Sequence, residues 1–368
     1  MHRQLAKKIW VFTILIMTMG MMALYSASYQ NVRVTNSIFY DQLFCAVIGL
    51  FMMWILSRLD YRKFYEVSYI FYILNVLLLF GVLLAGRHAL GAKRWMEMGP
   101  LSFQPSEMTK LAVILMLGRY LSDRRPTLSF TIRSWLRNIF KDILFPFFLT
   151  VLPAAFIFKQ PDLGTALLIF GIFFVMLFVS GLEYKYFVWF LIICLSLVPF
   201  GWHFLKQYQK DRLLVFLNPN IDPLGAGYTI IQSKIAIGSG GLFGNGWLSG
   251  TQNQLNFLPE RHTDFIFSVI GEEWGLAGTI FMLTCFFVLI NCGLTIAHQV
   301  KDRFGVLVTS GIVAILTFQV IINVGMTLGL CPIVGITLPF TSYGRSSFMI
   351  FVIMMGFLLS LSKRRTIF

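Results

Sequence analysis

Residues 265–290 read FIFSVIGEEWGLAGTIFMLTCFFVLI, and only Glu272 and Glu273 are charged in this stretch. A helix needs about 20 apolar residues to cross the hydrocarbon core of a bilayer. The stretch is longer than that, so it predicts a membrane-spanning helix with two carboxylates inside the span.

Similar apolar runs lie on both sides, near residues 9–26, 42–57, 64–85, 106–121, 143–158, 163–180, 186–205, 304–330 and 347–361. The chain of 368 residues is 57% hydrophobic and 12% charged, with a mean hydropathy of +0.75, whereas an average soluble protein carries about 25% charged residues. We therefore expect an all-α polytopic membrane protein with about ten transmembrane helices, built as a single domain over residues 1–368. The run at 9–26 is expected to be a retained span, although its small-residue end imitates a signal-peptide cleavage site.

The basic residues predict the orientation. Most of the 30 lysines and arginines fall in alternate short segments, beginning with Arg3, Lys7 and Lys8, and short basic loops stay in the cytoplasm. We expect a bacterial inner-membrane protein with cytoplasmic N- and C-termini. Basic residues of the stretches 87–110 and 206–234 fall on the outer side instead, so function is sought there. The basic residues form no single groove or stripe, which argues against nucleic-acid binding.

Two stretches do not have the pattern of a span. Residues 206–263 form a large external loop, whose glycine-rich part at 238–250 matches neither a dinucleotide fingerprint nor a P-loop. Tight turns and close helix packing are the expected role of these glycines. Residues 331–344 are apolar but contain two prolines. They predict a re-entrant loop, because non-helical backbone at membrane depth must be covered by protein or water.

Ionisable residues within or beside spans are candidates for function, because burying them is costly. Glu107 and Lys110 are three residues apart and share a helix face, so they can form an internal salt bridge or contact a substrate. Asp162 stands in KQPDLGT at 159–165, where a helix cap explains it equally well.

Asp264 is the most suggestive carboxylate, because it stands where the external loop enters the span at 265–290. There it can act as a general base towards a hydroxyl group, although an acid at a helix start is more often a cap. At about 100° per residue, Glu273 points away from Asp264 by about 180° and Glu272 by about 80°. The two glutamates therefore cannot both share a pocket with Asp264 unless the helix is broken.

Several motifs follow one another along nearly the whole chain: GAKRW (91–95), QPSE (104–107) with Lys110, QPDLGT (160–165), DPLGAGY (222–228), IQSKIAIGSGGL (231–242), GTQ (250–252), PERHTD (259–264) and LPFTSYG (338–344). In this order they resemble the shape, elongation, division and sporulation (SEDS) family. The block at 259–264 resembles the RodA branch more than the FtsW or SpoVE type. One departure is Arg345, where the family usually has a second glycine.

The resemblance implies a ten-helix fold and a peptidoglycan glycosyltransferase that polymerises lipid II into a growing glycan strand during cell elongation, with its active site facing outside. It also implies a class B penicillin-binding transpeptidase, other elongation-complex membrane proteins and membrane lipids as partners. Asp264 is then the catalytic base, and undecaprenyl diphosphate is the leaving group. The substrate-binding candidates are Arg94, Glu107, Lys110, Asp162, Arg212, Lys234, His262 and Ser342.

No cofactor is implied with certainty. The five cysteines have no C-x-x-C spacing and the histidines are scattered, so neither a disulfide framework nor a metal site is predicted. Whether Mg²⁺ or Mn²⁺ shares the charge stabilisation stays open at this point.

Two other classes of function remain open. A transporter that moves lipid II across the membrane also suits ten helices, a re-entrant loop and intramembrane charges. It needs charges along a path through the bilayer, however, whereas the candidates gather near the outer face. A scaffold that only recruits a transpeptidase leaves the buried acids without a role.

Overall fold

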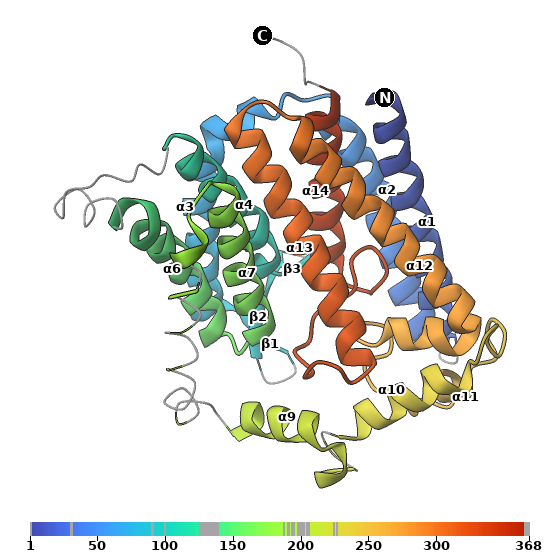
Figure 1. Cartoon of the computed structure of the whole chain (residues 1–368). Coiled ribbons are helices and arrows are strands. Elements are labelled where there is room, and N and C mark those ends of the chain that lie inside the picture. The colour runs from blue at the N-terminus through green and yellow to red at the C-terminus, as the bar shows by residue number, and fades with distance from the viewer. Residues whose placement is uncertain are drawn as a thin grey trace.

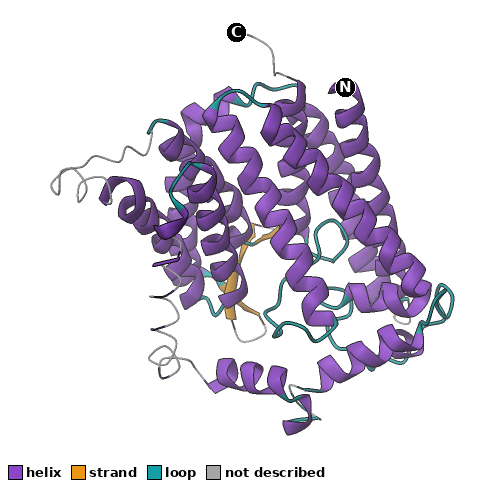
Figure 2. Cartoon of the chain, in the orientation of Figure 1, coloured by secondary structure: helices purple, strands orange, loops and turns teal. Residues whose placement is uncertain are grey.

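The computed structural model describes residues 2–29, 32–89, 92–98, 101–124, 140–186, 207–223, 225 and 227–363, together with isolated residues between 188 and 203. Helices dominate this part of the chain and pack into one bundle (Figures 1 and 2). The start of α1 (His2–Ser28) and the end of α14 (Arg345–Lys363) lie together at one end, the terminal end. Helices α9 (Gln207–Leu217) and α10 (Tyr228–Ser239) lie across the opposite end, which we call the loop end.

Seven helices in the described residues are long and apolar enough to cross a membrane. Besides α1 and α14 they are α2 (Val32–Leu56), α3 (Arg62–Ala85), α6 (Phe145–Lys159) with the π-helical turn η1 (Phe140–Leu144) before it, α12 (Ile266–Gln299) and α13 (Arg303–Thr327). The shorter helices α4 (Pro105–Ser122) and α7 (Leu163–Val179) pack against α13 in the same bundle. The all-α polytopic class is therefore confirmed. The predicted span at 186–205 lies mostly outside the described residues, so the number of about ten stays a prediction.

Helix α13 forms the centre of the bundle, packed against α4, α7 and α12. Its buried side chains include Ile312, Ile315 and Leu316, each at most 1% exposed. Helix α1 packs along α12, and α2 packs along α14. The first apolar run is thus packed into the bundle.

A small sheet joins α3 to α4 and was not predicted from the sequence. Its strands are β1 (Arg87–Ala89), β2 (Ala92–Met98) and β3 (Leu101–Phe103), paired antiparallel in the order β1-β2-β3. The pairing satisfies backbone groups of a connection that cannot continue either helix. Arg94 lies on the central strand of the sheet. This residue belongs to the stretch 87–110, whose basic residues fall on the outer side in the predicted orientation.

The connection expected at residues 206–263 is largely folded. Besides α9 and α10 it contains the 3₁₀ turn η2 (Pro219–Ile221) and the short helix α11 (Thr251–Gln254). Part of its glycine-rich run lies directly on α12: the backbone N–H groups of Asn245 and Gly246 donate to the carbonyls of Glu272 (3.0 Å) and Glu273 (3.1 Å). The expected role of these glycines in close packing is confirmed.

Helix α12 is broken at Gly275, where φ is 62° and ψ is −158°. A Cβ at this position would lie 2.4 Å from the backbone nitrogen of Gly244. Both the backbone conformation and the lack of space therefore require glycine. The break turns the first segment of α12, residues 266–274, across the loop end (Figure 1).

We predict that Gly275→Ala destabilises the fold by at least about 2 kcal/mol, because this backbone region is essentially closed to other residues. Thermal unfolding of the purified protein in detergent measures the effect. Gly81→Ala in α3 is the matched control, since a Cβ there meets no atom within 4 Å. An equal Tm for both variants would contradict the packing described at Gly275.

Candidate active site

Asp264 stands at the end of the connection, just before α12. The residue that caps α12 is Phe265, and no side chain forms a cap hydrogen bond there. Among the residues that the structure describes, no hydrogen bond reaches the Asp264 carboxylate, and the residue is partly exposed. Helix capping therefore does not explain this aspartate, and its carboxylate is available to a substrate.

The side-chain amide of Asn323 positions Asp264. Its Nδ2 atom donates to the backbone carbonyl of Asp264 (2.9 Å) and to that of Ile336 (2.7 Å). Asn323 is fully buried on α13. The two bonds thus join the segment before α12 to the loop between α13 and α14.

That loop is irregular, as expected of residues 331–344, and its second half is mostly buried. Ile336, Leu338 and Phe340 are each at most 3% exposed. Other elements approach its backbone closely through glycines: a Cβ on Gly164 would lie 2.7 Å from the Val334 carbonyl oxygen. Protein thus covers most of the non-helical backbone at residues 336–342, as predicted for this loop.

Gly335 brings the loop to the catalytic candidate. Its φ is 69°, in the left-handed region that favours glycine, and a Cβ there would lie 3.5 Å from Asp264 Oδ2. The loop therefore passes directly beside the carboxylate.

Arg94 and Asp162 meet at the turn between α6 and α7. Arg94 Nε donates to the Gln160 carbonyl (2.9 Å), and its Nη2 donates to the Pro161 carbonyl. Asp162 is the cap of α7, since its Oδ1 accepts from the Thr165 N–H at 3.2 Å. The capping interpretation of Asp162 is confirmed, and the cap lies next to an arginine from the sheet.

Nearby charges and burial change the pKa values of Asp264 and Asp162. Burial and then the Glu260 charge raise the pKa of Asp264 to about 7, while Arg212 and Arg94 oppose the rise. Burial also raises the pKa of Asp162, against the charge of Arg94. A carboxyl group whose pKa is raised towards neutral pH suits a general base, because the best catalytic pKa lies near the operating pH.

Glu107 and Lys110 form the ion pair expected from their spacing. Lys110 Nζ lies 2.8 Å from both carboxylate oxygens of Glu107, inside α4. The Lys110 side chain is 0% exposed and that of Glu107 is 8% exposed. Glu107 also acts electrostatically on Asp162. We define the charged cluster as the set Arg94, Glu107, Lys110, Asp162, Arg212 and Asp264.

Helix α9 contributes Arg212 to the cluster, whereas the candidate on α10 lies outside it. Arg212 Nη1, from α9, donates to the Ile333 carbonyl (3.2 Å). Lys234 lies on α10 against the turn at Gly329, and no described hydrogen bond or ion pair joins it to the cluster.

His262 and Ser342 belong to the contact between the connection and the buried loop. The His262 carbonyl accepts from the Tyr343 N–H (2.8 Å), and burial lowers the pKa of the imidazole. Ser342 Oγ accepts from the Leu338 N–H (2.8 Å). The serine hydroxyl is therefore engaged in shaping the loop.

Glu272 and Glu273 are not part of the cluster. Glu272 accepts from the N–H groups of Gln252 (2.7 Å) and Asn253 (3.1 Å) at the start of α11. Glu273 accepts from Ser26 Oγ of α1. The inference from helical geometry that the glutamates do not both share the pocket of Asp264 is confirmed.

Sequence reasoning missed Asn323 and Gly335. An asparagine inside the apolar run 304–330 was the available signal for the first, because a polar side chain inside a span needs partners. Arg345 is the residue at which the chain departs from the family pattern. Its guanidinium donates to Ser102 Oγ (2.9 Å) and lies 3.7 Å from Asp41 Oδ2.

Within the described part of the chain, no group of three His, Cys, Asp or Glu side chains could hold a metal ion.

Fold and site together define a polytopic membrane protein that brings a desolvated carboxylate and basic side chains together beside a buried irregular loop. The FtsW/RodA/SpoVE family model, described as "Cell cycle protein", matches residues 6–367, and the chain belongs to this family.

Individual relatives agree with this assignment. The chain is 41% identical over 322 residues to the peptidoglycan glycosyltransferase MrdB of Escherichia coli K12, covering 86% of this chain and 84% of MrdB. It is 33% identical to the peptidoglycan glycosyltransferase RodA of Treponema pallidum, covering 96% and 97% of the two chains. Among solved structures, a chain from "Structural coordination of polymerization and crosslinking by a peptidoglycan synthase complex" superposes with a TM-score of 0.81 at 35% identity, covering 97% of each chain.

We predict that Glu107→Gln destabilises the protein by about 3–5 kcal/mol, because it leaves the buried Lys110 ammonium without its counter-charge. The control is Glu183→Gln, which breaks an exposed pair with Lys185 of 2.6 Å and should leave Tm unchanged. Thermal unfolding of both variants in the same detergent compares them. Equal, small shifts would show that the buried pair does not hold α4 in place.

Proposed function

We propose that this protein is a peptidoglycan glycosyltransferase that polymerises lipid II, with Asp264 as the general base. The observation that carries the proposal is the Asp264 carboxylate, which accepts no hydrogen bond from the described residues and has a pKa of about 7. The relatives named as peptidoglycan glycosyltransferases support the reaction class.

In the proposed step, Asp264 takes the proton of the GlcNAc 4-hydroxyl of the acceptor as that oxygen attacks C1 of the donor MurNAc. The new C1–O bond forms as the bond from C1 to the diphosphate breaks, with inversion at C1. The bonding electrons leave with undecaprenyl diphosphate, and Asp264 later releases its proton to water. One carboxylate suffices, because a diphosphate leaving group needs charge stabilisation more than a proton.

Arg94 and Arg212 are the proposed partners of the diphosphate. Both act on Asp264 electrostatically, and arginine can bind phosphate oxygens through two parallel N–H groups. Lys110 is paired with Glu107 inside α4, so we assign that pair to holding the helix. Lys234 is a further candidate from α10, and His262 and Ser342 shape the adjoining loop.

The proposed orientation places the terminal end in the cytoplasm and the loop end outside the bacterial inner membrane. The start of α1 and the end of α14 lie on the same side of the bundle, and the terminal end carries Arg3, Lys7 and Lys8, in accord with the retention of basic segments in the cytoplasm. The charged cluster lies towards the loop end, where an aqueous acceptor is accessible.

We propose a class B penicillin-binding transpeptidase as the partner and cell elongation as the process. The similar chain of known structure belongs to a peptidoglycan synthase complex that combines polymerization and crosslinking, and MrdB and RodA are among the similar relatives. Membrane lipids surround the bundle, and other membrane proteins of the elongation machinery are proposed as further partners.

We predict that Asp264→Asn lowers the polymerisation rate at least 100-fold, as expected when a general base is lost. The measurement is glycan-strand formation from purified lipid II by this protein with its cognate transpeptidase. Glu183→Gln is the control, because that exposed carboxylate pairs with Lys185 (2.6 Å) and is no part of the charged cluster, so the variant should keep the wild-type rate.

Two outcomes would contradict this assignment. Equal strand formation by wild type and a folded Asp264→Asn variant would make Asp264 a structural acid. If neither protein forms strands while vesicles containing wild type show lipid II crossing the bilayer, the protein is a transporter.

The pH dependence gives an independent prediction. Because the pKa of Asp264 is raised to about 7, the ionised base becomes available only as the pH rises. The polymerisation rate should therefore increase roughly tenfold per unit at pH values well below 7 and level off above it. Initial rates between pH 5 and 9 test this, and a rate that falls over the same interval contradicts it.

A further inference from the structure

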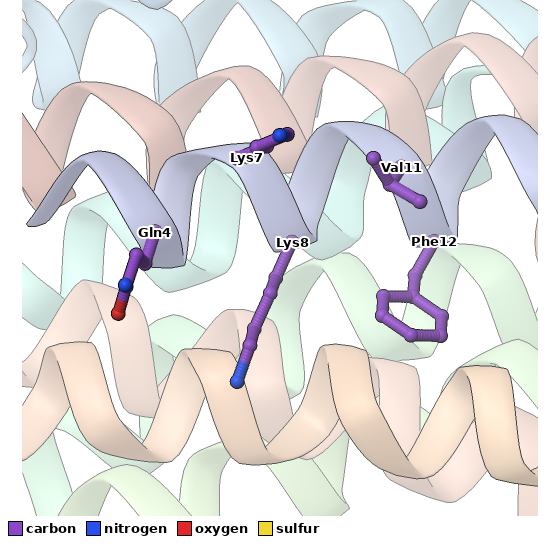
Figure 3. A pocket seen from close by; sticks show the side chains of 5 residues that line it. All are labelled: Gln4, Lys7, Lys8, Val11 and Phe12. Atoms are coloured by element: carbon purple, nitrogen blue, oxygen red, sulfur yellow. The ribbon is translucent and has the colours of Figure 1, made fainter. Parts of the chain in front are cut away.

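A groove of about 410 Å³ runs along α1 (Figure 3). The start of α1 lies at the terminal end, away from α9 and α10 (Figure 1). It is lined by Gln4, Lys7, Lys8, Val11 and Phe12. Side chains three and four positions apart are neighbours on a helix surface, so the five form one continuous stripe. Figure 3 shows Gln4, Lys8 and Phe12 projecting from the same side of the helix. None of the five has a role in the proposed glycosyl transfer.

The polar part of the groove is cationic. Helix α1 contains no aspartate or glutamate, and neither does the part of α12 at residues 284–299. The two helices pack together, and the Lys8 ammonium acts electrostatically on the Cys292 thiol of α12. Within the described residues, no carboxylate forms a salt bridge with Lys7 or Lys8. The positive charge at the groove is therefore suited to an anionic ligand.

The order of the side chains along α1 matches the build of a phospholipid. Gln4, Lys7 and Lys8 lie towards the start of the helix, and Val11 and Phe12 follow one turn deeper. Since α1 is long and apolar enough to cross a membrane, its start lies near the bilayer surface and the next turns lie in the hydrocarbon region. A phospholipid in the bilayer has its phosphate at the surface and its acyl chains below. The phosphate would therefore lie beside the lysines, and the acyl chains beside Val11 and Phe12.

We propose that this groove binds an anionic phospholipid in the leaflet on the side of the termini, with Lys7 and Lys8 at the phosphate and Val11 and Phe12 against the first acyl carbons. A free phosphate ion would use only the lysines and would leave the apolar part of the groove empty. The proposal does not depend on the glycosyltransferase activity.

Native mass spectrometry of the full chain, released from nanodiscs with equal amounts of phosphatidylglycerol and phosphatidylcholine, tests the proposal. Wild type should retain phosphatidylglycerol selectively. Lys7→Gln with Lys8→Gln should weaken that binding about 30-fold, since each lysine near an anionic headgroup contributes about fivefold. The matched control, Lys63→Gln with Lys185→Gln, removes the same charge from other exposed positions and should retain the lipid.

Equal retention of the two lipids by wild type, or unchanged retention by the Lys7/Lys8 variant, would overturn the proposal. Displacement of the lipid by millimolar inorganic phosphate would instead indicate a site for a soluble anion. A dimer that the Lys7/Lys8 variant loses while its lipid count stays unchanged would assign the groove to a second copy of the chain.

A second measurement uses wild type alone, so it does not depend on whether the variant folds. A phosphatidylglycerol analogue with a photoreactive group next to the phosphate should label the segment 2–14 when the peptides are mapped by mass spectrometry. Labelling confined to other segments would overturn the proposal.

Discussion

The site depends on a requirement that the bilayer imposes on every irregular segment: its backbone polar groups must find partners within the protein. Asn323 meets this requirement for two segments at once, because its Nδ2 atom donates to the carbonyls of Asp264 and Ile336. The segment before α12 and the loop after α13 are thereby held against each other on α13, at the centre of the bundle. Without this amide, both carbonyls would lose the hydrogen bond that it donates. The contact between Asp264 and the loop at Gly335 would then lose the support of α13.

The glutamates of α12 perform a comparable task at the loop end. Glu272 satisfies the N–H groups at the start of α11, and Glu273 accepts from Ser26 at the end of α1. The break at Gly275 is what turns their segment across the loop end. Their cost of burial is thus offset by hydrogen bonds that attach the folded connection to α1 and α12, which explains two intramembrane acids without assigning them to the reaction.

Apolar length predicted the helices well, because a span must satisfy its backbone internally whatever its neighbours are. The helical arrangement also separated the glutamates of α12 from Asp264 correctly. The small sheet, the helices of the connection and the break at Gly275 depend on contacts between segments far apart in the chain, which no local pattern reveals. Arg94 and Asp162 were recognised as candidates from the sequence. The fold was needed to show that they meet at the α6–α7 turn, and to show the roles of Asn323 and Gly335, because these too depend on long-range contacts.

Asp162 and Asp264 show why residue type alone did not identify the base. Both precede a helix, and burial raises the pKa of both. The carboxylate of Asp162 accepts the N–H of Thr165 and is therefore committed to α7. The cap position of α12 falls one residue later, on Phe265, so the carboxylate of Asp264 remains without a partner among the described residues. A shift of one residue in where the helix begins thus separates an acid that stabilises a helix from one that can accept a proton from a substrate.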